Sequence, residues 1–186
     1  MARNLMQHHR NIVLIGFMGT GKSAVGRALA GRLQWRHWDT DTEIEREIGS
    51  SVADCFAAEG EAAFRQRETA MLARLLTDLS AERSILSTGG GTPLRPENTT
   101  LLQQSGTIVW LQASPEAILS RIGVNLRSRP LLADYLDDPK ERIEGLLAAR
   151  SSQYAALAEY AIDTSKCAGP LQTADEIISL IGLHQE

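Results

Sequence analysis

Residues 16–23 read Gly-Phe-Met-Gly-Thr-Gly-Lys-Ser and fit the spacing G-x-x-x-x-G-K-[ST] at every position. An apolar run, 12–15, precedes this segment, and apolar residues at helical spacing follow it, so it lies at a strand-to-helix turn. Glycines there let backbone N–H groups point at phosphate oxygens beside the helix N-terminus. Lys22 would place a charge on the β- and γ-phosphates, and Ser23 would offer a hydroxyl to Mg²⁺. The pattern predicts a nucleotide site; the alternative is a glycine-rich turn that matches by chance.

Two carboxylates, Asp39 and Asp41, follow the stretch 35–38, which we predict to be the second strand. Ligands of open α/β sheets bind at the carboxyl ends of the strands, so these aspartates are candidate contacts for a metal or a substrate. Thr40-x-x-Glu43 has the pattern of a capping box and predicts that a helix begins here. Capping would explain one of the carboxylates. We expect a functional role for at least one of them.

The chain between the second and third predicted strands holds more helical sequence than one crossover needs. We expect this insertion, about 40–70, to build a substrate pocket over the sheet edge, with Arg65 beside its apolar face. Phe56 and Phe64 are predicted to be core residues rather than platforms for a ligand.

Three successive glycines, Gly89, Gly90 and Gly91, end the third predicted strand, 84–88. Such a run carries a heavy entropic cost, which is expected where backbone must approach a ligand and offer its N–H groups. A flexible turn is the alternative.

A basic segment, 121–132, follows the fourth predicted strand and its helix. It contains the cluster Arg121, Arg127 and Arg129, and its part 123–130 has a glycine hinge at one end and a proline at the other. We predict a lid, because lids bring cations to a transferring phosphoryl group and exclude water when they close. A plain surface loop is the alternative.

Strands and helices alternate along the whole chain, which predicts a three-layer α/β/α domain with a five-stranded parallel sheet. The remaining predicted elements are strand 107–111, a helix capped by Ser114, a helix opened by Asp138 that carries Arg150, strand 161–164, and a final helix capped by Thr173.

Composition narrows the class further. The chain has 186 residues and a formal net charge of −4, which suits one domain with no general basic field for nucleic acid or acidic lipid. Its two cysteines are too few for a disulfide framework. No apolar run is long enough to cross a membrane, and residues 1–10 are expected to be a disordered extension of a domain over 11–186. These features predict a cytoplasmic protein, and we expect a monomer.

Six motifs in order resemble shikimate kinase, a compact member of the nucleoside-monophosphate-kinase-like phosphate-loop enzymes. The resemblance runs from about residue 11 to about residue 169. Its motifs are Gly-Phe-Met-Gly-Thr-Gly-Lys-Ser (16–23), Asp-Thr-Asp (39–41), Phe-Arg-x-x-Glu (64–68), Ser-Thr-Gly-Gly-Gly (87–91), Arg-Pro-Leu-Leu (129–132) and Arg-x-x-x-Tyr (150–154). The family's strand order, 2-3-1-4-5, is implied with it.

The resemblance also implies roles for individual residues. Ser23 and Asp39 would hold Mg²⁺, and Lys22, Asp41 and Arg129 would act in catalysis, with Asp41 accepting a proton from the acceptor hydroxyl. Lys166 stands where the family commonly has an arginine near adenine. The ATP-binding residues would be Gly19, Thr20, Gly21, Lys22, Ser23, Ala24, Arg121, Arg129 and Lys166, and the residues that bind shikimate would be Asp41, Arg65, Gly89, Gly90, Gly91 and Arg150.

The implied reaction is transfer of the γ-phosphoryl group of ATP to the 3-hydroxyl of shikimate, which gives 3-phosphoshikimate for aromatic amino acid biosynthesis. Two rivals stay open. A gluconate kinase would share the fold and reaction but would not be expected to carry both Phe-Arg-x-x-Glu and the triple glycine. A catalytically silent nucleotide-binding module would be expected to have lost at least one of Lys22, Ser23, Asp39 and Asp41.

Overall fold

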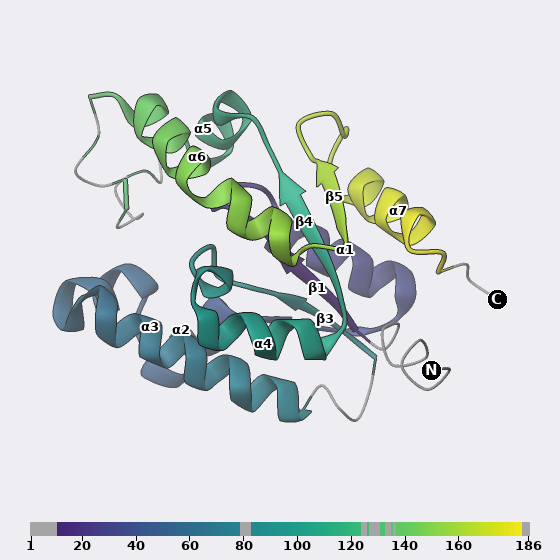
Figure 1. Ribbon diagram of the computed structural model, residues 1–186, viewed down its shortest axis with the longest axis horizontal. Coiled ribbons are helices and arrows are strands. Elements are labelled where there is room, and N and C mark those ends of the chain that lie inside the picture. Colours follow the sequence, from purple (N-terminus) through teal and green to yellow (C-terminus); the bar gives the residue numbers. More distant parts are fainter. Residues whose placement is uncertain are drawn as a thin grey trace.

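The computed structural model describes residues 11–78, 83–123, 126, 131–132, 135 and 137–183. Its centre is a five-stranded, wholly parallel sheet in the order β2-β3-β1-β4-β5, as predicted (Figure 1). The strands are β1 (Asn11–Ile15), β2 (Arg36–Asp39), β3 (Ser84–Ser87), β4 (Thr107–Gln112) and β5 (Tyr160–Asp163).

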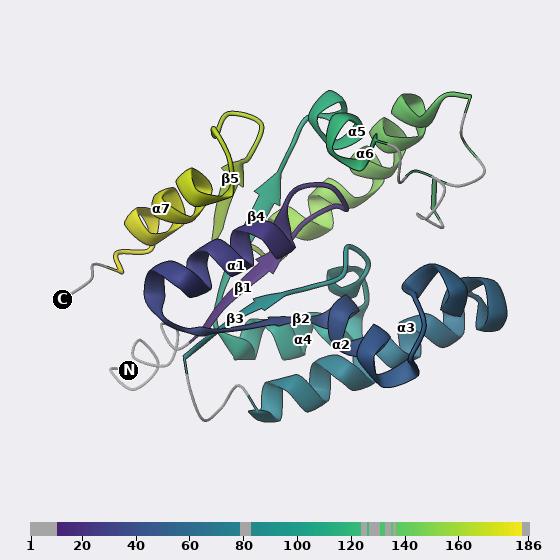
Figure 2. The same ribbon diagram turned by 180° about the vertical axis from the view of Figure 1, so that it is seen from behind.

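Helices cover both faces of the sheet, so the domain has three layers (Figures 1 and 2). On one face lie α1 (Lys22–Leu33) and α7 (Pro170–Leu180). The other face carries α2 (Thr40–Ile48), α3 (Val52–Asp78), the 3₁₀ turn η1 (Thr92–Leu94), α4 (Pro96–Ser105) and α6 (Pro139–Leu157). Helix α5 (Pro115–Ile122) packs beside α6.

The central strand β1 shows how the sequence sets these layers. All five of its residues are buried, as expected for a parallel strand covered on both faces. Ile12 and Leu14 join the core beneath α1 and α7, whereas Val13 and Ile15 join the core beneath α3, α4 and α6. This alternation follows from the two-residue period of a strand. None of the described helices is long and apolar enough to cross a membrane.

Two predicted helix caps are wrong, one by a single residue and the other by four. Asp39 rather than Thr40 caps α2, because its carboxylate accepts from the N–H groups of Asp41 and Thr42. Helix α7 begins at Pro170, and Thr173 lies inside it with its hydroxyl bonded to the carbonyl of Gly169. In each case an earlier residue serves as the N-cap: Asp39 for α2, and Gly169, followed by Pro170, for α7.

Two further features refine the insertion and its surroundings. Helix α3 is kinked at Gly60, whose φ of 83° and ψ of 168° lie outside helical space, so it comprises two helical segments. Helix α4 was not predicted. Its sequence, Pro-Glu-Asn-Thr-Thr-Leu-Leu-Gln-Gln-Ser, offers Leu101 and Leu102 alone as apolar residues, which is too little for a periodic signal.

Candidate active site

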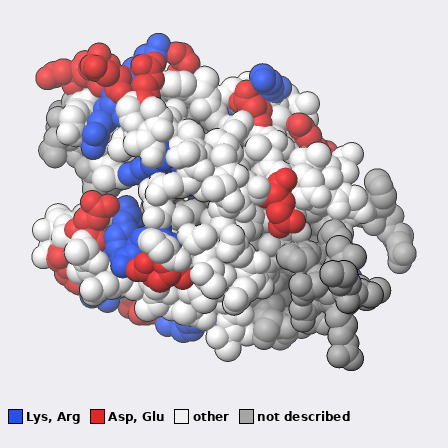
Figure 3. Space-filling model, viewed as in Figure 1, with Lys and Arg blue, Asp and Glu red and all other residues white. Residues whose placement is uncertain are grey.

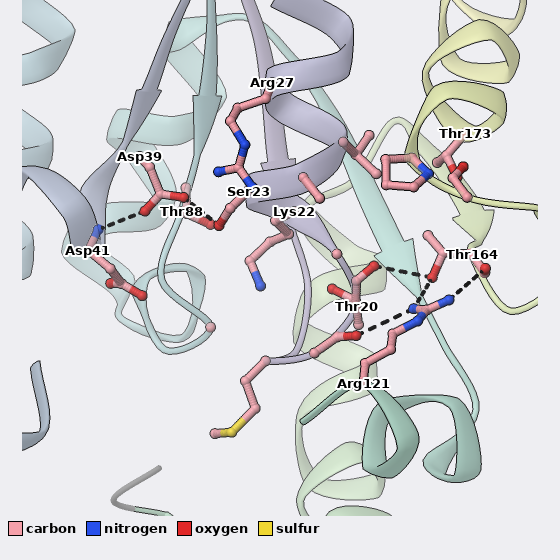
Figure 4. Close-up of a pocket in the computed structure, with 18 residues that line it drawn as sticks. Thr20, Lys22, Ser23, Arg27, Asp39, Asp41, Thr88, Arg121, Thr164 and Thr173 are labelled. Carbon is pink, nitrogen blue, oxygen red and sulfur yellow. Dashed lines mark hydrogen bonds between the residues drawn. The ribbon is translucent and has the colours of Figure 1, made fainter. Parts of the chain in front are cut away.

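Two pockets adjoin at the carboxyl edge of the sheet. The larger, about 630 Å³, is lined by the loop before α1, by Arg121 and by residues near β5 and α7 (Figure 4). The second, about 390 Å³, lies between α3, the glycine run and α6. Residues that line both are Met18, Ser23, Asp39, Asp41 and Gly90. A group bound in one pocket therefore faces a group bound in the other across the two aspartates.

The loop before α1 is held open by its own backbone geometry. Gly21, the N-cap of α1, has a φ of 95°, which L side chains rarely adopt. A Cβ on Gly16 would lie 2.3 Å from the carbonyl oxygen of Leu111. The Nζ atom of Lys22 arches back and donates to the carbonyls of Gly16 and Phe17, at 2.9 Å each. These contacts place the lysine charge at the centre of the loop.

The two residues predicted to hold Mg²⁺ are in direct contact. The hydroxyl of Ser23, at the start of α1, donates to Oδ2 of Asp39, at the end of β2, across 2.6 Å. The same carboxylate caps α2 through Oδ1. A hydroxyl and a carboxylate at the mouth of a phosphate loop fit Mg²⁺, which takes few protein ligands and keeps phosphate oxygens and waters around it. No cluster of three metal-ligating side chains occurs among the described residues.

Asp41 lies at the boundary between the pockets, and its side chain is partly buried. Burial, and next to it the negative charges of Asp39 and Glu68, together raise the pKa of Asp41 to about 7. Lys22 and Arg65 oppose these effects. A carboxylate with a pKa near neutral pH is suited to accept a proton from a hydroxyl placed against it.

Glu68 is a component of the site to which the sequence analysis gave no function. It is fully buried, accepts from the hydroxyl of Thr92 at 2.8 Å, and forms an ion pair with Arg65. Arg65 also pairs with Glu61 at 3.0 Å. Glu68 and Thr92 are 24 positions apart in the sequence, so no local pattern would predict their contact.

The glycine run is explained by side chains that pack against it. A Cβ on Gly89 would lie 2.4 Å from Oε1 of Glu68 and 2.7 Å from Oδ1 of Asp41, and one on Gly91 would lie 2.3 Å from the guanidinium of Arg65. The backbone N–H of Gly89 donates to the hydroxyl oxygen of Thr40. The glycines thus allow charged side chains to reach the pocket, in addition to lining it themselves.

Arg150 reaches the second pocket from α6. Its guanidinium carbon lies 5.5 Å from the centroid of the Phe17 ring. Among the described residues Arg150 forms no ion pair, whereas Arg65 forms two. One turn further along α6, the hydroxyl of Tyr154 donates to the carbonyl of Gly90 across 2.6 Å and fixes the helix against the glycine run.

Basic side chains also surround the outer opening of this region. Figure 3 shows blue surface on both sides of the hollow near the ends of α3 and α6. A pocket of about 370 Å³ there is lined by Arg65, Arg95 and Arg150, and Glu61 is the one acidic side chain among the described residues that line it. The second pocket is therefore reached past positive charge.

The opposite end of the larger pocket is closed by Arg121. Its guanidinium donates to the hydroxyl and the carbonyl of Thr164, at 2.8 Å each, and to the carbonyl of Gly19 at 3.3 Å (Figure 4). Lys166 lies outside the residues that line this pocket; it is exposed and pairs with Asp163 at 3.2 Å. Arg127, Arg129 and the rest of 127–130, with 124–125, lie outside the described residues, so half of the predicted lid, 121–132, is not described.

The fold and these adjoining pockets define a phosphate-loop kinase of small molecules. A family model with the description "SKI: Shikimate kinase" matches residues 18–181. The chain belongs to the shikimate kinase family.

Similar proteins cover nearly the whole chain. A shikimate kinase of Pelotomaculum thermopropionicum is 45% identical over 175 residues, which are 94% of this chain and 97% of the relative. A shikimate kinase of Neisseria gonorrhoeae is 41% identical over 87% of this chain and 92% of the relative. The structure of shikimate kinase from Acinetobacter baumannii in complex with shikimate superposes with a TM-score of 0.85, at 36% identity and with 96% of each chain covered.

Proposed function

We propose that the chain transfers the γ-phosphoryl group of ATP to the 3-hydroxyl of shikimate, giving ADP and 3-phosphoshikimate. The observation that carries this proposal is the junction of the two pockets: a phosphate loop opens on one side of Asp39 and Asp41, and a pocket with Arg65 and Arg150 opens on the other. Family membership and the shikimate complex of the Acinetobacter relative support the choice of acceptor.

The larger pocket would bind ATP. Backbone N–H groups of the loop from Gly19 to Ala24 would hold the phosphates, Lys22 would turn its ammonium from the loop carbonyls toward the β- and γ-phosphates, and Arg121 would lie at the nucleotide end. Ser23 and Asp39 would hold Mg²⁺, which neutralises phosphate charge when bound.

The second pocket would bind shikimate. The carboxylate of shikimate would contact Arg150 and Arg65, because a planar guanidinium binds a carboxylate through two parallel hydrogen bonds. Its hydroxyls would then point toward Asp41 at the boundary. A neutral acceptor hydroxyl is a weak nucleophile, and Asp41 would orient it and accept its proton as the phosphoryl group transfers.

A coupled ADP-release assay tests the proposal, with shikimate, quinate, gluconate and nucleoside monophosphates as acceptors. We expect ATP-dependent turnover with shikimate at least about 100-fold above the others in kcat/KM, which corresponds to about 2.7 kcal/mol of discrimination. Faster turnover with gluconate would reassign the acceptor. Binding of ADP without turnover of any acceptor would instead indicate a silent nucleotide-binding module.

A further inference from the structure

A buried hydrogen-bond chain lies directly beneath the phosphate loop. The ring atom Nε2 of His37, in β2, is 2.9 Å from Oγ of Ser87, at the end of β3. The same Oγ donates to the main-chain carbonyl of Lys22, the first residue of α1, across 3.1 Å. Ser87 is buried at 1% exposure, so water cannot readily replace either partner.

The direction of each bond follows from the atoms. A carbonyl oxygen accepts only, so the single hydroxyl hydrogen of Ser87 points to Lys22. Ser87 must then accept from His37, which assigns the hydrogen to Nε2 of the imidazole. An imidazolium would donate through the same atom. The bond is therefore independent of the charge state of His37.

Helix α1, which follows the loop, has a glycine where the side chains of this hydrogen-bond chain pack against it. A Cβ on Gly26, in α1, would lie 2.4 Å from Nε2 of His37 and 2.6 Å from Oγ of Ser87. Gly26 is helical and is itself buried. A glycine inside a helix costs about 1 kcal/mol relative to alanine, and here it leaves the space that the imidazole and the hydroxyl occupy. Gly31, in the same helix, has no atom within 4 Å of its Cβ position.

The hydrogen bonds of His37 and Ser87 connect three elements, β2, β3 and α1, whose ends carry residues of the site. Two residues after His37, β2 ends at Asp39, which lies opposite Ser87 in the strand register. Immediately after Ser87, the chain passes through Thr88, which lines the nucleotide pocket, to the glycine run. Helix α1 begins with Lys22 and continues with Ser23. A shift in the first turn of α1 would therefore move the lysine and the hydroxyl relative to Asp39.

We propose that His37 is a positioning residue for the phosphate loop, which acts through Ser87 on the carbonyl of Lys22 to fix the first turn of α1 against the sheet. This role deepens the proposed function and rests on it. His37 lines neither of the two pockets; it determines where the loop N–H groups and Lys22 lie when a nucleoside diphosphate binds. Arg27 and Asp39 are the charged groups that influence His37 from α1 and β2.

Binding of ADP, measured by calorimetry in EDTA, tests the role without metal and without turnover. His37→Phe removes the donor but keeps a ring, and Ser87→Ala removes the relay. We expect each to weaken ADP binding about 3- to 10-fold, as for loss of one buried hydrogen bond, and the double variant to be no weaker than either single one. His37→Gln keeps an N–H donor and should bind within about 2-fold of wild type. The KM for shikimate should stay within about 2-fold.

A matched glycine pair gives an independent test in one helix. Gly26→Ala should displace the imidazole and hydroxyl and weaken ADP binding to a similar extent, whereas Gly31→Ala should not change it. Equal ADP affinity in wild type, His37→Phe and Ser87→Ala, with a lowered melting temperature alone, would overturn the positioning role. So would an equal loss in His37→Gln. Failure of the wild type itself to bind ADP would instead overturn the proposed function.

Discussion

The carboxylate of Asp39 serves two different partners through its two oxygens. Oδ2 accepts from the hydroxyl of Ser23 at 2.6 Å, while Oδ1 accepts from the first N–H groups of α2. The end of β2 and the starts of α1 and α2 are therefore fixed at one point. Any metal held by Ser23 and Asp39 would sit at this junction.

Because the two oxygens of Asp39 have different partners, we predict that two substitutions of this residue will differ in their effect on stability. Asp39→Asn keeps an oxygen for the helix cap but loses the charge, so we expect the Mg²⁺ concentration for half-maximal turnover to rise about 10-fold or more, with stability nearly unchanged. Asp39→Ala should show the same metal defect and also lose about 1 kcal/mol of unfolding free energy, because the cap is lost. Mg²⁺ titration of turnover and chemical denaturation measure the two effects. An unaltered Mg²⁺ requirement in both variants would contradict a metal role.

Lys22→Met should fold and lose nearly all turnover. The ammonium lies in the phosphate loop, where a preorganised cation typically contributes about 100-fold or more to phosphoryl transfer. Methionine fills a similar volume without the charge. Steady-state ADP release checks the loss, and circular dichroism checks the fold. Near-normal turnover would disprove the assignment of the loop as catalytic.

The raised pKa of Asp41 predicts a pH dependence of stability. In the folded protein its pKa is about 7, against 3.8 for an ordinary aspartate, so between these values the folded state binds a proton that the unfolded state does not. The contribution of Asp41 to the unfolding free energy is therefore complete below pH 3.8 and is lost as pH rises toward 7, by at most about 1.4 kcal/mol per pH unit.

Asp41→Asn removes this titration and provides the measurement. Its stability relative to wild type should increase from pH 4 to pH 7 and stay constant above, as followed by urea unfolding across pH. Turnover at pH 7.5 should fall about 100-fold if Asp41 accepts the proton. A small change in kcat with a large rise in the KM for shikimate would make Asp41 a positioning residue instead. Parallel stability profiles for both proteins would rule out the raised pKa.

The sequence predicts the parts of this site that depend on neighbours along the chain. The phosphate loop, the sheet order and the placement of both aspartates at one strand end follow from local motifs and the resemblance they carry. The contacts of Glu68 with Thr92, of Thr40 with Gly89 and of His37 with Ser87 join residues 24, 49 and 50 positions apart. Sequence periodicity does not reveal such pairs, because they form only when strands, helices and turns from distant parts of the chain meet in the folded domain.

Gly91→Ala tests whether the glycine run serves to admit Arg65. An alanine Cβ would lie 2.3 Å from the guanidinium and displace it. We expect the KM for shikimate to rise about 10-fold, with the KM for ATP within about 2-fold of wild type. Gly145→Ala in α6 is the matched control, because no atom lies within 4 Å of its Cβ position. Equal KM values for both variants would show that the guanidinium adapts without cost.

Arg150 and Arg65 should contribute unequally to recognition of a carboxylate. Arg65 already shares its charge with Glu61 and Glu68, whereas Arg150 pairs with no carboxylate among the described residues. A substrate carboxylate would therefore gain more from Arg150, and charge-assisted hydrogen bonds of this kind contribute about 1.5 to 3 kcal/mol each. Arg150→Ala should raise the KM for shikimate about 10- to 100-fold and leave ATP binding nearly unchanged.

The carboxamide analogue of shikimate isolates this interaction from the rest of the pocket. Wild type should discriminate against the carboxamide about 10-fold or more in kcat/KM, because an amide nitrogen cannot accept from a guanidinium. In Arg150→Ala that preference should shrink, since the group that distinguishes the two acceptors is gone. Lys140→Ala, on the exposed side of the same helix, is the control and should keep the full preference. If wild type used both acceptors equally well, neither arginine would read a carboxylate, and the preference for shikimate over a neutral polyol would lose its physical basis.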